Sequence, residues 1–285
     1  MSLKLFLVLA LALISVSSTS LVIRYVGSVP ALTLAFWRML SASGMLWGYS
    51  LAFPSGSLTN SNKKLIVFAG LSLGLHFAFF FIGVRNTSIA NATLFATTGP
   101  FFTTLFSLFM GEKFKKKIYW GLGLASLGLI IIQGSSFSLD SKNLFGNLIS
   151  LLSGLCIAFT FIFASKIRKN TKNVVYGRTL FFIASITIGV MALVLNDGLF
   201  DFKREHIVWL LFLGLVPSIF GHNMLNYSIK FLSPTAVASV PLGEPLIASF
   251  FAYFLFSESI PTEALIGGPF ILLGIYFIIT GHSKD

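Results

Sequence analysis

Long apolar segments follow one another along most of the chain and are separated by short polar stretches. A membrane-spanning α-helix needs about 20 predominantly apolar residues. The pattern predicts ten such helices, over residues 3–23, 30–52, 64–83, 88–110, 118–135, 144–165, 174–195, 207–228, 235–256 and 263–281. Only the connections 53–62 and 196–206 are long, so no separate soluble domain fits between the helices. The fold class predicted is an all-α integral membrane protein with ten transmembrane helices.

The composition agrees with this prediction. Hydrophobic residues make up 55% of the 285 residues and charged residues 10%, and a soluble domain of this length could not cover so much apolar surface. The formal net charge is +11, but Lys and Arg are spread over short loops, which favours membrane topology over nucleic-acid binding. The expected surroundings are therefore a lipid bilayer, with no nucleic-acid partner. We interpret residues 3–23 as a retained first helix, because the apolar character continues through Ile23.

The distribution of basic residues predicts the orientation of the helices. With the N-terminus in the cytoplasm, thirteen Lys and Arg residues fall in inner segments and five in outer ones, while Arg38 and Arg178 lie within helices. Cytoplasmic loops of membrane proteins carry the excess of Lys and Arg. We therefore expect a multi-pass protein of the inner (plasma) membrane with both termini in the cytoplasm.

Several positions recur in order in the two halves of the chain. Residues 88–100 align with residues 233–245, and the further matched pairs are His76 with His222, Glu112 with Glu258, Gly121 with Gly267 and Gly128 with Gly274. This order predicts an internal duplication, with a first repeat at 1–140 and a second at 141–285. Because each repeat holds five helices, an odd number, the second must enter the membrane in the opposite sense. Inverted repeats with a binding site between them are typical of secondary transporters.

Glu244 is the only acid well inside an apolar segment, where Pro241, Gly243 and Pro245 surround it. It lies about ten residues into its helix, or roughly 15 Å from the inner end at the helical rise. An ionisable residue at that depth is costly and is a functional-site hypothesis by default. We expect Glu244 to bind a coupling proton or a cationic group of a substrate. The alternative is that Glu244 only caps or cross-links helices.

Other polar and aromatic side chains inside the predicted helices complete the candidate substrate or coupling-ion site. They are Ser18, Arg38, His76, Phe80, Thr98, His222, Asn223, Asn226 and Tyr227. A histidine in the middle of the membrane beside aromatic residues is a ligand candidate, although a buried histidine that only hydrogen-bonds a neighbour is the commoner case. Arg38 lies deep and needs a partner: Glu244, an anionic substrate group or helix-end carbonyls. The hydroxyl of Ser18 faces a cavity or, alternatively, marks close helix packing.

The sequence contains no signature of an enzyme. His-Glu-x-x-His, a phosphate-binding glycine loop and a pair of midmembrane aspartates are all missing, and the Gly-x-Ser-x-Gly spacing at 70–74 lies inside a predicted membrane helix rather than at a strand-to-helix turn. No acid, cysteine or second histidine lies at metal-ligand spacing on the helices that carry His76 and His222. We therefore expect no catalytic residue, no cofactor and no metal. The energy for transport would come from a gradient, and the proton is one candidate coupling ion.

The chain resembles the EamA family of the drug/metabolite transporter superfamily over essentially its whole length. The resemblance rests on the two repeats, an Arg in the second helix of each, a Pro near the middle of 88–110 and of 235–256, and two kinds of local motif. The motifs are the loops beginning Met110-Gly111-Glu112-Lys113 and Phe256-Ser257-Glu258-Ser259, and the entries Trp120-Gly121 and Ile266-Gly267 to the last helix of each repeat. It implies a basket of helices around a central cavity, lined by the first, third and fourth helices of each repeat. The Ser/Thr run at 15–20 replaces an aromatic-plus-glycine feature that is frequent in relatives.

The resulting functional expectation is a secondary active transporter of small amphipathic metabolites, such as amino acids or related compounds. It would work by alternating access at a midmembrane site between the repeats. One alternative within the same family is an uptake carrier for a nucleoside-like metabolite such as S-adenosylmethionine. Alternatives from other classes are a receptor that does not transport and a membrane-embedded enzyme.

Overall fold

The computed structural model describes residues 2–134, 141–256 and 260–281. The predicted boundary at 140, Glu258 and the positively charged Lys284 lie outside the described residues. The described helices are α1 (Leu3–Tyr25), α2 (Ala31–Ala52), α3 (Asn60–Asn86), α4 (Ile89–Ala96), α5 (Gly99–Phe109), α6 (Lys116–Gln133), α7 (Leu144–Ile167), α8 (Asn173–Val194), α9 (Ile207–Leu213), α10 (Asn223–Ser228), α11 (Pro234–Ser239), α12 (Glu244–Phe256) and α13 (Thr262–Gly281). Two further segments, the π-helical η4 (Gly214–His222) and the 3₁₀-helical η5 (Val240–Gly243), join some of them.

The all-α prediction is confirmed, because the described residues contain helices and no strand. All ten predicted segments are helical, and seven helical stretches of the described chain are long and apolar enough to cross a membrane. Three predicted segments are not continuous α-helices. Residues 88–110 form α4 and α5, residues 207–228 form α9, η4 and α10, and residues 235–256 form α11, η5 and α12.

Proline and glycine explain these interruptions. A proline inside a helix removes one backbone donor and clashes with the preceding turn. Pro217 lies within the π-helical segment η4, Pro241 lies within η5, and Pro100 follows the break between α4 and α5. Ser88 and Ser233, which the repeat alignment pairs, both cap their helices, accepting hydrogen bonds from the backbone N–H groups of Asn91 and Ala236. The two capped helices therefore begin in the same way.

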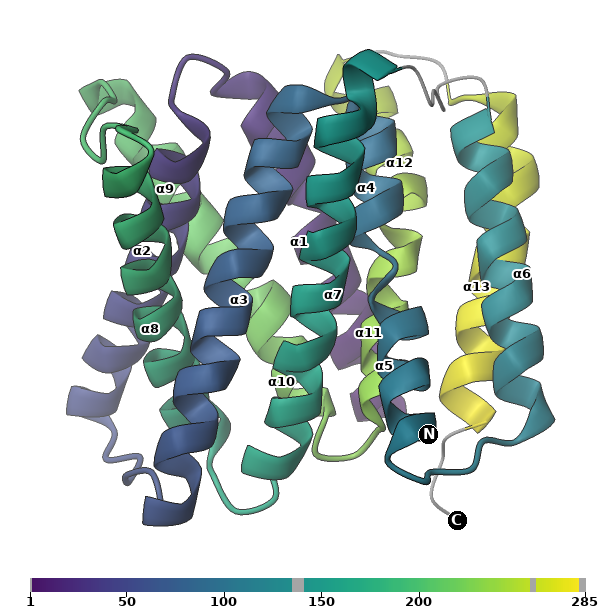
Figure 1. The fold of residues 1–285 in the computed structure, drawn as a ribbon, viewed down its shortest axis with the longest axis horizontal. Coiled ribbons are helices and arrows are strands. Elements are labelled where there is room, and N and C mark those ends of the chain that lie inside the picture. The colour runs from purple at the N-terminus through teal and green to yellow at the C-terminus, as the bar shows by residue number, and fades with distance from the viewer. Residues whose placement is uncertain (1, 135–140, 257–259, 282–285) are drawn as a thin grey trace.

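The helices pack in pairs across the middle of the bundle. α2 packs against α8, α3 against α7, α5 against α11, and α6 against α13, while α1 packs against η4 and α10. In Figure 1, α6 and α13 lie together at one side of the bundle, and α1 begins at the same edge at which α13 ends. The α6–α13 contact is close because glycines face backbone. A Cβ atom built on Gly128 would lie 2.5 Å from the carbonyl oxygen of Gly267.

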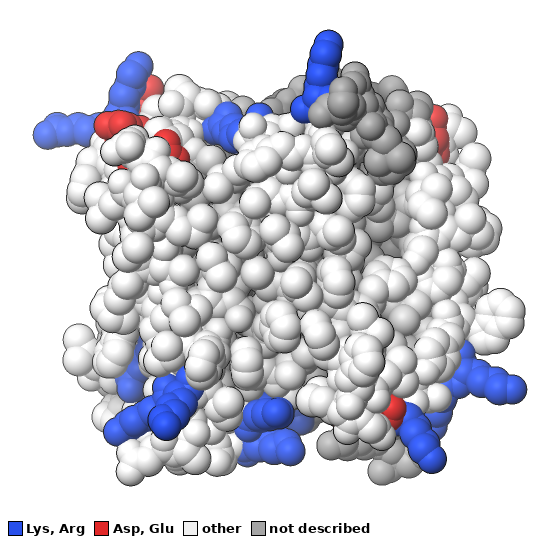
Figure 2. All heavy atoms as spheres, viewed as in Figure 1, with Lys and Arg blue, Asp and Glu red and all other residues white. Residues whose placement is uncertain are grey.

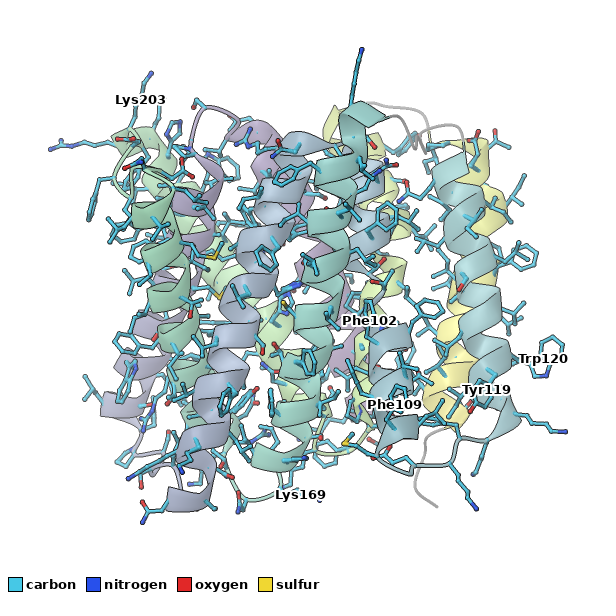
Figure 3. The ribbon with its side chains drawn as sticks, in the orientation of Figure 1. Phe102, Phe109, Tyr119, Trp120, Lys169 and Lys203 are labelled. Atoms are coloured by element: carbon cyan, nitrogen blue, oxygen red, sulfur yellow. The ribbon has the colours of Figure 1, made fainter. Side chains whose placement is uncertain are left out.

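Charged side chains are confined to the two edges of the bundle on the face shown in Figure 2, with an uncharged band between them. Lys169 and Lys203 lie at opposite edges (Figure 3); the count of basic residues places Lys169 in an inner segment and Lys203 in an outer one. Exposed aromatic residues such as Phe109, Tyr119 and Trp120 lie toward the edge that carries Lys169. Aromatic rings are enriched at the membrane interface, so this arrangement fits a bundle that crosses a bilayer.

Candidate functional site

A cavity lies between the two halves of the chain, and its empty space, including the part open to solvent, is about 540 Å³. Its walls come from α1, α2, α3, α4 and the start of α5 in the first half, and from α7, η4, α11, η5 and the start of α12 in the second. The titratable side chains on its wall are Arg38, His76, His222 and Glu244. His76 and His222, which the repeat alignment pairs, thus line the same cavity from opposite halves of the chain.

Arg38 is held from several sides, and its side chain is only 1% exposed. Its Nε donates to the hydroxyl of Ser218 at 3.0 Å, and its terminal nitrogens donate to the hydroxyl of Thr19 at 3.3 Å and to the carbonyl of Pro217 at 3.4 Å. The guanidinium carbon lies 4.2 Å from the centroid of the Phe77 ring, a cation–π contact. Of the partners weighed from the sequence, a backbone carbonyl is present, and two hydroxyl groups that the sequence did not suggest complete the set. Arg38 is therefore a fixed positive charge on the cavity wall.

Glu244 is the first residue of α12, directly after the 3₁₀-helical turn η5. Gly243 lets this turn approach α1, since a Cβ there would lie 2.9 Å from a methyl carbon of Leu13. Within the described part of the chain, the carboxylate has no hydrogen-bond partner and no ion-pair partner within 4.0 Å, although Arg38 lines the same cavity. A half-buried carboxylate without a fixed partner is available to a cation or a proton that enters the cavity.

His76 and His222 lie side by side with ring centroids 6.2 Å apart. Nδ1 of His76 is 3.0 Å from the backbone oxygen of Ser153, whose hydroxyl donates to the His76 carbonyl at 2.9 Å. With the proton on Nδ1, donated to that oxygen, Nε2 remains an acceptor. His222 packs edge-on against Phe77 at 5.0 Å between ring centroids and has no hydrogen-bond partner among the described side chains. His76 is thus anchored to α7, and His222 is held by packing.

The rest of the wall is aromatic, aliphatic or hydroxylated. Phe77, Phe80 and Phe161 supply rings, and Thr19, Thr93 and Thr97 supply hydroxyl groups. The cavity thus combines one fixed cation, one free carboxylate and apolar rings, which is the surface that an amphipathic solute with both charges requires.

Two predicted site residues face other hollows. Ser18 lies on the side of α1 that borders an apolar hollow with Tyr25, Trp209 and Phe251, and its hydroxyl donates to the Ser15 carbonyl at 2.7 Å. Thr98 borders a hollow between α4, α5 and α6, and its hydroxyl donates to the Phe95 carbonyl at 2.6 Å. Neither residue lines the central cavity in this structure, contrary to our expectation for both.

Asn223, Asn226 and Tyr227 also lie away from the cavity. The amide oxygen of Asn223 faces Gly177 of α8, and the backbone oxygen of Asn226 accepts a hydrogen bond from Arg168 at 3.1 Å. Tyr227 borders a pocket formed by the α7–α8 loop and the end of α10. These three residues therefore connect α10 to α7 and α8. Of the predicted set, Arg38, His76, Phe80, His222 and Glu244 remain on the cavity wall.

Several residues that support the site could hardly be recognised from the sequence. Ser153 and Ser218, which hold His76 and Arg38, are single hydroxyls inside apolar segments and resemble ordinary packing residues. Thr19 belongs to the Ser/Thr run at 15–20 that stands out in the sequence. Its neighbour Ser18 is the residue predicted from that run, whereas Thr19 is the residue that contacts Arg38. Among the described residues, no three His, Cys, Asp or Glu side chains gather at a spacing that could hold a metal ion.

Comparison with known proteins agrees with the geometry. The EamA-like transporter family matches residues 3–134 and again residues 144–280. An uncharacterized transporter of Archaeoglobus fulgidus is 29% identical over 252 residues, which cover 85% of this chain and 86% of that protein. The pseudopaline exporter CntI of Pseudomonas aeruginosa is 27% identical over 248 residues, which cover 86% and 85% of the two chains.

A solved crystal structure shows the same fold. It superposes with a TM-score of 0.80 over 97% of both chains at 16% sequence identity, an identity that supports the fold alone. Family matches in both halves and transporter relatives along most of the length show the class of protein. The chain belongs to the EamA-like transporter family and is a multi-pass membrane transporter.

Proposed function

We propose that the protein is a secondary active transporter of small amphipathic metabolites that carry an amino group, such as amino acids and their derivatives. The observation that carries this proposal is the carboxylate of Glu244, which lines the central cavity without a hydrogen-bond or ion-pair partner among the described residues. A positively charged amine would supply the missing partner. A proton would compete for the same carboxylate, and this competition provides the coupling.

The remaining wall fits the rest of such a solute. The Arg38 guanidinium supplies positive charge opposite to that of Glu244, so a zwitterion would meet complementary charges. Phe77, Phe80 and Phe161 would cover its apolar part. The name of the Pseudomonas relative gives pseudopaline as its cargo, which supports a metabolite as the class of cargo here. The same rings would also stack on a nucleoside base, so S-adenosylmethionine belongs among the solutes to be tested.

We further propose that the two halves are inverted repeats that expose the cavity alternately to each side of the inner membrane, with both ends of the chain cytoplasmic. Three features support this. The pairs α2–α8 and α6–α13 each join equivalent helices of the two halves, and the α5–α11 pair joins the matched segments 88–110 and 235–256. The breaks before α5 and before α12 occupy matched positions, and each is followed by a proline. α1 begins and α13 ends at one edge of the bundle (Figure 1).

Transport into proteoliposomes tests the proposal. The probe is a mixture of isotope-labelled amino acids, N-alkylated amino acids and S-adenosylmethionine, quantified by mass spectrometry under proton gradients of both polarities. The test variant is Glu244→Gln, which keeps shape and hydrogen bonding but cannot ionise. Glu263→Gln, at the start of α13 and away from the cavity, removes the same charge as a matched control.

The wild type and Glu263→Gln should accumulate at least one solute when a gradient is imposed. Glu244→Gln should lose accumulation, and its residual exchange should no longer depend on pH. If Glu244→Gln accumulates the same solute with the pH profile of the wild type, the carboxylate is structural. If no solute moves in any arm, the protein is not a carrier for this class of metabolite.

A further inference from the structure

A second polar pocket, distinct from the central cavity, lies at the edge of the bundle that carries Lys169 (Figure 3). The loop between α7 and α8 and the end of α10 form it, and its empty space, including the part open to solvent, is about 770 Å³. Four cations line it, Arg168, Lys169, Lys172 and Lys230, and no acidic residue does. A concentration of positive charge in a hollow, with no compensating acid, is suited to an anion.

Arg168 shows that this pocket is more than a group of surface lysines. Its side chain is only 3% exposed. Nε donates to the backbone oxygen of Asn226 at 3.1 Å, and one terminal nitrogen donates to the backbone oxygen of Thr171. Within the described part of the chain the other terminal nitrogen has no hydrogen-bond partner. A fixed guanidinium with donors to spare is well suited to phosphate oxygens.

The surroundings add to the positive potential. α8 begins at Asn173, and its first turn has neither a side-chain cap nor an acidic residue. The N–H groups of such a turn carry the positive end of the helix dipole and favour an anion. None of the four cations forms an ion pair within 4.0 Å with an acid of the described chain.

Apolar surface at the pocket indicates where the anion comes from. Tyr227 and Phe231 line the pocket with ring centroids 5.3 Å apart, and Phe231 is 48% exposed. Basic pockets between transmembrane helices on the cytoplasmic side are suited to lipid headgroups, and aromatic rings are typical at headgroup depth. We propose that this pocket binds the phosphate headgroup of an anionic phospholipid, with the acyl chains extending along the outside of the bundle.

Native mass spectrometry of the full-length protein tests the proposal. The probes are phosphatidylglycerol and phosphatidylcholine with identical acyl chains, and the measurement is the fraction of protein that retains each lipid. The test variant combines Lys169→Gln, Lys172→Gln and Lys230→Gln, and leaves Arg168 in place because it also holds α10. The control combines Lys63→Gln, Lys64→Gln and Lys113→Gln, three exposed lysines of the same predicted membrane side that do not line the pocket.

The wild type and the control should retain phosphatidylglycerol in preference to phosphatidylcholine. The pocket variant should bind phosphatidylglycerol about tenfold more weakly or worse, since each lysine near an anionic headgroup contributes to its attraction. Equal loss in the control would overturn the proposal, because the effect would then be one of total charge. Unchanged retention in the pocket variant would also overturn it.

A separate arm distinguishes a lipid from a soluble anion. Inorganic phosphate is added to the protein in neutral detergent, and the unfolding temperature is compared with that after addition of phosphatidylglycerol. The lipid should raise the unfolding temperature in the wild type and the control, and inorganic phosphate at the same concentration should not. Stabilisation by inorganic phosphate without any preference for phosphatidylglycerol would show a soluble-anion site and overturn the lipid assignment.

Discussion

The contact between α6 and α13 offers a sharp test of how the two halves of the bundle pack together. Gly128 of α6 faces Gly267 of α13, and Gly121 faces Gly274, so that each glycine lies against the backbone of its partner. Such small residues let transmembrane helices approach closely and gain van der Waals contact. The perturbation is Gly128→Ala, which adds one methyl group at the closest point.

The size of the clash follows from the structure. The new Cβ atom would lie 2.5 Å from the carbonyl oxygen of Gly267 and 2.8 Å from the backbone nitrogen of Ile271. Ordinary contact begins at 3.4 Å, so the helices must separate locally by about 0.9 Å. Backbone atoms cannot rotate away as a side chain does. Overpacking of this kind costs about 1–3 kcal/mol.

Gly123→Ala is the matched control, because it lies in the same helix and a Cβ there meets nothing within 4 Å. Alanine is the better helix former by about 1 kcal/mol, so Gly123→Ala should hold or raise the unfolding temperature in detergent. Gly128→Ala should lower it. If both variants unfold at the wild-type temperature, or if Gly123→Ala is the less stable of the two, the assigned α6–α13 contact is wrong.

Three further predictions concern the site and the orientation. Arg38→Lys keeps the charge but loses the planar donors that reach Ser218, Thr19 and Pro217. It should lower the free energy of unfolding by about 1.5–3 kcal/mol for each hydrogen bond that is not replaced. Denaturation measures this, and wild-type stability would contradict it. Thr97→Phe places a ring on the cavity wall and should block transport in proteoliposomes, whereas Ser18→Phe lies outside the cavity and should not block it. If Ser18→Phe blocks transport and Thr97→Phe does not, the placement of these two residues is wrong. In a Cys156→Ser background, an impermeant thiol reagent applied to intact cells should label a cysteine at Asp201 but not at Lys116, and labelling at Lys116 would reverse the proposed orientation.

Much of the fold could be predicted from the sequence because a bilayer limits the choices. Backbone groups in hydrocarbon must be satisfied within the chain, so apolar segments of sufficient length form helices. The expected segment 144–165 corresponds to α7 at Leu144–Ile167, and 263–281 to α13 at Thr262–Gly281. The geometry of the breaks was harder to predict, because proline marks where a hydrogen bond is missing but not which turn replaces it. The π-helical segment around Pro217 is an example.

The candidate site could be predicted in part for the same reason. Arg38, His76, His222 and Glu244 are titratable groups deep in apolar segments, and all four line one cavity. Ser18 and Thr98 were harder to place, because hydroxyl groups are satisfied by their own helix and occur on any face. The break at residues 97 and 98 also changes the direction in which neighbouring side chains point, so that Thr97 lines the cavity and Thr98 does not line it. Asn226 and Tyr227 lie beyond the π-helical segment, whose wider turn rotates the following face of the helix.

The two halves of the chain match in form but differ in charge at the cavity. The alignment that pairs Pro100 with Pro245 also pairs Gly99 with Glu244, and both residues line the cavity, yet only the second carries a carboxylate. Conversely, Arg38 of the first half lies on the cavity wall, whereas Arg178 of the second lies 4.1 Å from the Trp47 ring and donates to the carbonyl of Gly56 in the 53–62 loop at 2.8 Å. Each half thus contributes one charge of opposite sign, although the two helix frameworks correspond. A transport cycle that exposes the cavity to each side in turn can reuse the common framework. Under the proposed function, the charged pair would give a bound zwitterionic solute a single preferred orientation, because its amine and its acidic group could not exchange partners without exchanging halves.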